Sequence, residues 1–330
     1  MRFSTARLPS TAPSSTPHAA AQADAQTQPV DEFALIAEYF AGDAGAVLGI
    51  GDDAALVEVP LGQQLAVAVD TLVAGRHFPE ATPPEAIGHR ALAVNLSDLA
   101  AMGATPHWYT LALTLPEAEP TWLAGFSKGL RSLGAAHGCA LIGGDTTRGS
   151  LTVTVQVMGA VTAPALTRGG ACPGDRVFVG GFLGDAVGGL NDAAQGLHSA
   201  LASRFHYPQP QLALGQALRH VATACIDVSD GFVADLNHVL RASGVGAEID
   251  LESLPLSPEL VASVGHEAAQ RLALSGGDDY VLCFTVPAEA RAACLSACHE
   301  VGRITTEPGL RLRDRDGAFI EEVVDGYRHF

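Results

Sequence analysis

The sequence contains little positive charge. Its 330 residues include 19 Lys and Arg against 36 Asp and Glu, so the formal net charge is −17 at pH 7. A chain this acidic is not expected to bind nucleic acid or an anionic membrane through a basic surface. Anionic small substrates remain possible, provided that bound metal ions supply the positive charge.

Long apolar runs and a disulfide pattern are also missing. No run approaches the ~20 apolar residues that a membrane span needs. Six Cys in a chain of this length do not make a disulfide scaffold, and Cys139, Cys225 and Cys283 lie in apolar runs typical of core thiols. Residues 1–30 are rich in Ser, Thr, Ala, Pro and Gln and are expected to be a disordered extension. These features predict a cytoplasmic protein.

The common nucleotide-binding motifs are absent or contradicted by their context. There is no G-x-x-x-x-G-K-[ST], which excludes a P-loop enzyme. Residues 49–54 match the dinucleotide fingerprint G-x-G-x-x-A, but Asp52 and Asp53 would repel a pyrophosphate. Residues 56–59 after them look like a strand rather than the helix that this motif requires.

The composition is that of a protein with a large core, because 48% of the residues are hydrophobic and only 17% are charged. Strand-like and helix-like segments alternate in both halves, which predicts an α/β fold with α+β layers in two domains. Residues 163–174 contain two Pro and three Gly and interrupt the hydrophobic pattern. We therefore place the domains at residues 31–163 and 164–330.

Apolar periodicity predicts the individual elements. The expected strands are 65–69, 108–115, 139–142, 151–161, 176–179, 222–228, 247–251 and 281–286. The expected helices are 31–41, 84–103, 119–137, 184–195, 209–220, 232–242 and 288–299.

The helix expected at 84–103 is the most informative of these. Its apolar composition predicts burial, and Asn95 and Asp98 lie three residues apart on one face. A buried charge needs a partner, and residues 91–103 contain no Lys or Arg. A divalent cation is therefore a candidate partner for Asp98.

Acidic residues beside Gly recur where apolar runs end. Carboxylates at the ends of strands face the mouth of a sheet, where ligands bind. Gathered there, they would repel one another, and Mg²⁺, which prefers oxygen ligands and phosphates, would relieve the repulsion. Single Asp-Gly pairs commonly make turns, but the repetition favours a site for the set. The residues are Asp52, Asp53, Asp70, Asp145, Asp227, Asp230, Asp278 and Asp279.

Seven stretches in order resemble the thiamine-monophosphate kinase family, which belongs to a superfamily with aminoimidazole ribonucleotide synthetase and selenophosphate synthetase. Together they span about residues 31–330. They are GIGDDA at 49–54, VDTLVAGRHF at 69–78, AVNLSDLAAMG at 93–103, IGGDTTRG at 142–149, DVSDGFVAD at 227–235, SGGDDYVLCFTVP at 275–287 and GYRHF at 326–330.

The resemblance implies a function and a set of site residues. The fold would be two α/β domains that form a homodimer through the N-terminal domains, with the nucleotide near the subunit junction. The activity would be ATP-dependent phosphorylation of thiamine monophosphate to thiamine diphosphate. The implied Mg²⁺ ligands are Asp53, Asp70, Asp98, Asp145, Asp227 and Asp230. The implied ATP contacts are Gly144, Asp145, Arg168 and Ser229, and the implied thiamine-phosphate contacts are His77, Asp278 and Tyr327.

Two departures from the family pattern affect this assignment. The family usually has hydroxyl residues before the position of Asp70, whereas this chain has Ala68 and Val69, so a metal contact at Val69 must use its carbonyl oxygen. The family commonly has Glu at the position of Asp278. No catalytic side chain is predicted, since the acceptor phosphate has a second pKa near ~6 and needs little general-base help.

The alternatives are another ATP-using member of the superfamily, a two-metal phosphatase, and a metal-binding protein without activity.

Overall fold

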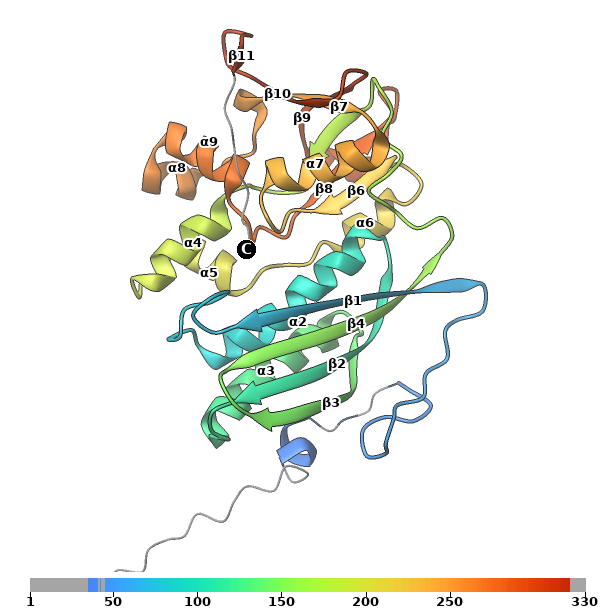
Figure 1. Cartoon of the computed structure of the whole chain (residues 1–330), viewed down its shortest axis with the longest axis vertical. Helices are drawn as coiled ribbons and strands as arrows, with labels where there is room; N and C mark the ends of the chain where they lie inside the picture. Colours follow the sequence, from blue (N-terminus) through green and yellow to red (C-terminus); the bar gives the residue numbers. More distant parts are fainter. Residues whose placement is uncertain (1–34, 41, 43–44, 321–330) are drawn as a thin grey trace, which may run out of the picture.

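The computed structural model describes residues 35–40, 42 and 45–320. Within these ranges the chain forms two sheets, one of four strands in the order β1-β4-β2-β3 and one of seven in the order β11-β10-β7-β9-β5-β8-β6 (Figure 1). Helices cover both sheets, so the predicted α/β class is confirmed. The predicted extension at residues 1–30 lies outside the described residues. None of the helices in the described ranges has both the length and the apolar character of a membrane span.

The four-stranded sheet joins antiparallel and parallel strands. β1 pairs with β4 and β4 with β2 in antiparallel register, whereas β2 and β3 are parallel. Helices α2 and α3 lie behind the sheet in the view of Figure 1. The elements are η1 (Ile36–Phe40), β1 (Gln63–Val73), α2 (Pro84–Ala101), β2 (Thr105–Leu115), α3 (Pro120–Ala136), β3 (Ala140–Arg148) and β4 (Thr152–Thr162).

Helix α2 is buried on nearly all sides. It begins at Pro84, where the missing N–H costs nothing, and Gly103 follows its end with a positive φ of 65°. Gly88 lets α3 approach closely, because a Cβ there would lie 2.1 Å from Phe126 O. On the opposite side, a Cβ at Gly215 of α6 would lie 1.9 Å from Ala100 O. Helix α2 is therefore packed between α3 and the C-terminal half of the chain.

The C-terminal half contains the seven-stranded sheet and most of the shorter helices. The predicted boundary at 163–174 lies between β4 and β5. The elements are β5 (Arg176–Val179), α4 (Asp185–Ala194), α5 (Ala200–His206), α6 (Leu212–Leu218), β6 (Ala224–Asp227), α7 (Phe232–Ser243), β7 (Gly246–Asp250), η2 (Leu251–Ser253), α8 (Pro258–Val264), α9 (His266–Ser275), β8 (Leu282–Val286), η3 (Ala293–Ala297), β9 (His299–Thr305), β10 (Gly309–Arg313) and β11 (Phe319–Ile320).

Three expectations about elements are wrong. The helix predicted at 288–299 is replaced by the short 3₁₀ helix η3 and the start of β9, because β9 completes the sheet between β5 and β7. The strand predicted at 56–59 is reduced to one isolated bridge between Leu48 and Leu56. Asp70 and Asp145 lie inside β1 and β3 rather than at strand ends, since pairing with β4 and β2 continues past them. Asp227 is the last residue of β6, as predicted.

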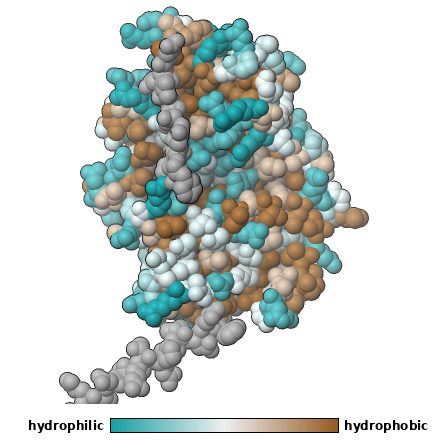
Figure 2. All heavy atoms as spheres, in the orientation of Figure 1, coloured by the Kyte–Doolittle hydropathy of each residue, from teal (hydrophilic) through white to brown (hydrophobic). Residues whose placement is uncertain are grey.

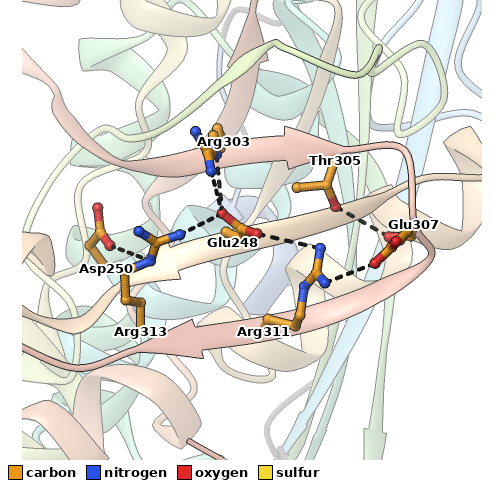
Figure 3. A network of polar contacts seen from close by, with 7 residues as sticks. All are labelled: Glu248, Asp250, Arg303, Thr305, Glu307, Arg311 and Arg313. Carbon is orange, nitrogen blue, oxygen red and sulfur yellow. Dashed lines mark hydrogen bonds and ion pairs between the residues drawn. The ribbon is translucent and has the colours of Figure 1, made fainter. Parts of the chain in front are cut away.

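An arginine cluster fixes the edge of the seven-stranded sheet. Arg303 of β9 and Arg311 and Arg313 of β10 converge on Glu248 of β7 (Figure 3). Their contacts to the Glu248 carboxylate measure 2.7, 3.4 and 2.8 Å, and the Glu248 side chain is 12% exposed. Asp250 pairs with Arg313 as well. These guanidinium groups are neutralised within the sheet, so they do not form a free basic patch.

The open face of the four-stranded sheet carries apolar side chains. Leu65, Val67 and Val69 of β1 are 42%, 51% and 58% exposed. Figure 2 shows hydrophobic residues gathered on the half of the molecule that carries this sheet, whereas hydrophilic residues are more frequent on the other half. Strand β1 therefore presents a row of three apolar side chains to solvent.

Candidate functional site

A cavity of about 610 Å³ lies between the two halves of the chain. Its walls come from β1 and the loop after it, from α2 and α4, and from the loops that follow β6 and precede β8. The structure thus brings together residues that are far apart in the sequence. Eight predicted site residues line this cavity: Val69, Asp70, His77, Asp98, Asp227, Ser229, Asp230 and Asp278.

Helix α2 fixes one acidic residue from each sheet at this cavity. Asn95 Oδ1 accepts a 3.0 Å hydrogen bond from the backbone N–H of Asp70 in β1. Ser97 Oγ donates a 2.7 Å hydrogen bond to Asp227 Oδ2 at the end of β6. Asp98, the next residue, lines the cavity itself. Three polar residues within four positions of one buried helix, Asn95, Ser97 and Asp98, therefore organise the acidic residues.

Three acidic residues of the cavity, Asp70, Asp98 and Asp227, have raised pKa values. Burial, followed by repulsion from Asp227 and Asp70, raises the pKa of Asp98 to about 8. Burial, followed by the charge of Asp230, raises the pKa of Asp70. Burial also raises the pKa of Asp227. Arg168 acts in the opposite direction on Asp98 and Asp227, which places its charge near them, although the residue is exposed and does not line the cavity.

A further acidic residue, Asp235, holds the loop that carries Ser229 and Asp230. Its Oδ2 accepts backbone hydrogen bonds from Ser229, Asp230 and Gly231 at 2.9, 3.0 and 3.2 Å. Burial raises the pKa of Asp235 to about 7. This supporting role was not predicted, although Asp235 belongs to the motif at 227–235.

Arg90 is the main residue that the sequence reasoning missed. It lies on α2 one residue before residues 91–103, which contain no Lys or Arg, and it is 1% exposed. Its Nη2 lies 2.6 Å from Asp278 Oδ1, so it pairs with Asp278 rather than with Asp98. The sequence does show an Arg within an apolar helix that is expected to be buried. It does not show which residue this Arg pairs with.

The other predicted residues lie elsewhere. Asp53, Gly144 and Asp145 line a second cavity of about 580 Å³. Asp70, Val155, Leu111 and Gly144 form one row across β1, β4, β2 and β3. With strands about 4.8 Å apart, Asp70 and Gly144 are separated by three spacings, roughly 14 Å. The acidic residues therefore form two groups within one chain rather than one.

The remaining predicted thiamine-phosphate contacts are His77 and Tyr327. His77 lines the acidic cavity, and its Nδ1 accepts a 2.9 Å hydrogen bond from the backbone N–H of Val73. This bond orients the ring and leaves the proton of the neutral imidazole on Nε2. Tyr327 lies outside the described residues.

The residues of the acidic cavity fit a cation that brings further ligands. Among the described residues, no three His, Cys, Asp or Glu side chains are arranged as a complete metal site. Mg²⁺, however, is usually held by one or two carboxylates together with water and substrate phosphates. The mutual repulsion of Asp70, Asp98 and Asp227 is the electrostatic setting in which such a cation is stabilised.

Comparison with known proteins agrees with this architecture. Residues 51–161 match the N-terminal domain of AIR synthase related proteins, and residues 173–315 match their C-terminal domain. The fold and the acidic cavity thus define an AIR synthase related protein. The thiamine-monophosphate kinase of Salmonella typhimurium is 45% identical over 318 residues, covering 91% of this chain and 98% of the relative. The chain belongs to the thiamine-monophosphate kinase family, which confirms the resemblance seen in the motifs.

Solved structures of the family have the same fold. The thiamine-monophosphate kinase from Stenotrophomonas maltophilia is 44% identical, with a TM-score of 0.78, covering 83% of this chain and 92% of the other. AaThiL complexed with AMPPCP and TMP is 35% identical, with a TM-score of 0.76, covering 85% of this chain and 92% of the other.

Proposed function

We propose that this protein transfers the γ-phosphoryl group of ATP to the phosphate of thiamine monophosphate, forming ADP and thiamine diphosphate. An acceptor oxygen forms the new bond to the γ-phosphorus while the bond to the β,γ-bridging oxygen breaks. Membership of the family supports this activity, and the acidic cavity shared by both halves of the chain is the observation that carries it. The use of ATP fits a cytoplasmic enzyme of thiamine diphosphate synthesis.

The acidic residues of the cavity would hold Mg²⁺. Asp70, Asp98, Asp227 and Asp230, which line this cavity, would supply the carboxylate ligands, and Val69 could contribute only its carbonyl oxygen. When bound, Mg²⁺ reduces the repulsion between two polyanions and stabilises charge in the transition state. Ser97 and Asn95 keep Asp227 and the backbone of Asp70 in place.

The remaining site residues would position the two substrates. His77 and Asp278 line the acidic cavity and would contact thiamine monophosphate, and Tyr327 would pack on its cationic ring. Ser229 and Arg168 would contact ATP from the C-terminal half. No general base is needed, because the acceptor phosphate is largely dianionic at neutral pH.

A homodimer accounts for the two separated acidic groups. The apolar face that carries Leu65, Val67 and Val69 is a surface suited to pairing with a second copy. Pairing of the N-terminal sheets would allow the cavity with Gly144 and Asp145 of one protomer to complete the acidic cavity of its partner. The N-terminal domain, residues 31–163, would then carry dimerisation and ATP binding, and residues 164–330 would complete the site.

The activity is tested by mixing purified protein with Mg-ATP and thiamine monophosphate. We expect ADP and thiamine diphosphate in equal amounts, with the product identified by its mass, and no ADP beyond background without the acceptor. Release of phosphate from thiamine monophosphate without nucleotide would indicate a phosphatase instead.

The shared site is tested by mixing two inactive variants. Asp98→Asn and Asp145→Asn change different cavities. If each active site uses one cavity from each protomer, exchange of subunits creates dimers with one intact site, and activity returns to about a quarter of wild type. Static light scattering gives the oligomeric state, and a monomeric protein with full activity would contradict the proposal.

A further inference from the structure

Arg90 of α2 carries a charge into the interior of the protein. Its side chain is 1% exposed, and its guanidinium lies 4.2 Å above the Phe205 ring and 5.6 Å from that of Tyr280. Nη1 donates a 2.6 Å hydrogen bond to Phe205 O. A position that served packing alone would cost less with an apolar side chain of similar volume. The guanidinium therefore needs an explanation beyond the core.

The ion partner of Arg90 is held by one oxygen only. Arg90 Nη2 lies 2.6 Å from Asp278 Oδ1, and Tyr280 OH donates a 3.0 Å hydrogen bond to the same oxygen. Asp278 Oδ2 has no polar partner among the described residues. The Asp278 side chain is 32% exposed and lines the acidic cavity. One oxygen is thus fixed from behind, and the other is available to a ligand.

The backbone around Asp278 is shaped to give this orientation. Asp278 and Tyr280 have φ values of 69° and 50°, in the left-handed region that non-glycine residues rarely adopt. Two 2.8 Å hydrogen bonds hold the turn, from Asp278 N to Ser229 O and from Tyr280 N to Val228 O. Strained turns of this kind persist only where their surroundings fix them. Arg90 is the charged part of those surroundings.

We infer that Arg90 is a positioning residue for the acceptor: it holds Asp278 Oδ1 so that Oδ2 receives an N–H donor or a cationic ring of the substrate. This inference rests on the proposed function, since thiamine monophosphate bears both an amino group and a positively charged ring. Asp278 is one methylene shorter than the Glu expected from the family pattern, so its reach is limited. The Arg90 guanidinium, anchored by Nη1 on Phe205 O, holds one oxygen of this shorter side chain through the ion-pair contact of Nη2.

The test compares Arg90→Met with a matched control. Arg176→Met removes a guanidinium that also pairs with a carboxylate (Glu300, 3.1 Å), bonds a backbone carbonyl (Ala290 O, 2.8 Å) and lies over an aromatic ring, away from the acidic cavity. We expect Arg90→Met to raise KM for thiamine monophosphate at least tenfold, with KM for ATP changed less than threefold. Arg176→Met is expected to change neither.

A second variant and a double mutant separate positioning from folding. Arg90→Lys keeps the charge but not the fork, so its KM for the acceptor should fall between wild type and Arg90→Met. Asp278→Asn should raise this KM as well, and the double variant with Arg90→Met should be no worse than Asp278→Asn alone, because both act through one carboxylate.

The outcomes that overturn the inference differ from failure of the proposed function. An unchanged KM for the acceptor in both Arg90 variants, or an equal rise in both KM values, refutes positioning. If wild type makes no thiamine diphosphate, the proposed activity fails. Calorimetric binding of thiamine monophosphate without ATP then tests Arg90 directly, with at least tenfold weaker binding expected in Arg90→Met. Absence of binding to wild type would refute the inference too.

Discussion

Ser97 Oγ donates a 2.7 Å hydrogen bond to Asp227 Oδ2, and this contact joins the two halves of the chain. Ser97 is fully buried on α2, and Asp227 ends β6 with 5% of its surface exposed. The hydrogen bond lowers the pKa of Asp227, although burial keeps it above its usual value. Ser97 thus favours the charged form that a metal ligand requires.

Replacing Ser97 with Ala should reduce both stability and metal use. A buried carboxylate without this donor costs about 1–3 kcal/mol of unfolding free energy. Residues that orient metal ligands typically contribute 10–100-fold to metal affinity, so the Mg²⁺ concentration for half-maximal activity should rise about tenfold or more. Urea denaturation and Mg²⁺ titration measure the two effects. Ser127→Ala is the control, because the only hydrogen bond of the Ser127 hydroxyl within the described part of the chain goes to Ala124 O of its own helix, at 3.3 Å. Equal effects in both variants would contradict the role of Ser97.

Asp98→Asn should separate activity from stability. Loss of a charged ligand should reduce kcat by about 100-fold or more. The same change removes repulsion with Asp227 and Asp70. Without metal at pH 8, the free energy of unfolding of the variant should therefore be about 1–2 kcal/mol higher than that of wild type. Mg²⁺ should raise the melting temperature of wild type more than that of Asp98→Asn. Activity near wild type would exclude Asp98 as a ligand.

The buried carboxyl groups should make stability without metal fall as pH rises from about 4 to about 8. Histidines whose pKa values are lowered by burial act in the opposite direction, and these are His89, His137, His206 and His238. Burial raises the pKa of Asp98 and Asp279 to about 8 and that of Asp235 to about 7, from an ordinary value of 3.8. In this window the unfolded chain has lost these protons while the folded chain keeps them. The unfolded state therefore binds fewer protons, and the free energy of unfolding decreases with pH.

Urea denaturation in EDTA from pH 4 to pH 9 measures this slope, to which we expect the buried carboxyl groups to contribute a loss of roughly 1–3 kcal/mol after solvent screening. Asp98→Asn should flatten the profile between pH 4 and pH 8. The control is Asp250→Asn, because Asp250 is 55% exposed and lies outside the cavity. An Asp98→Asn profile with the same slope as wild type would contradict the assignment.

The sequence predicted the parts of the fold that depend on local patterns. The helix at 84–103 was found because its apolar residues, its Pro start and its Gly end agree. The prediction of a helix at 288–299 was wrong, because β9 begins at His299 and pairs with β5 to complete the sheet. Local propensity does not contain that requirement. Asp70 was predicted at a strand end, but pairing with β4 extends the strand to Val73. This pairing is a tertiary effect that the local sequence pattern does not contain.

The candidate site was predicted as a set of residues but not as a geometry. Motif order identified Asp70, Asp98 and Asp227, which do share a cavity. The separation of Asp145 from them depends on strand order, which the sequence pattern does not specify. The pairing of Arg90 with a residue before β8 likewise depends on how the two halves meet.

Gly144 and the preceding Gly143 allow packing to be separated from nucleotide binding. A Cβ at Gly144 would lie 1.9 Å from Leu111 O, whereas a Cβ at Gly143 would have nothing within 4 Å. Both residues line the second cavity. Gly144→Ala should therefore lower the unfolding free energy by about 1–3 kcal/mol, since β3 must move away from β2. Gly143→Ala should change it by less than about 0.5 kcal/mol.

The new methyl of Gly143→Ala would enter the cavity. If ATP binds there, this variant should raise KM for ATP several-fold while its urea midpoint stays that of wild type, and KM for thiamine monophosphate should change little. Steady-state kinetics with each substrate varied in turn measures the split. A normal KM for ATP in Gly143→Ala would remove this cavity from the nucleotide site, and any loss of activity in Gly144→Ala would then reflect strand packing alone.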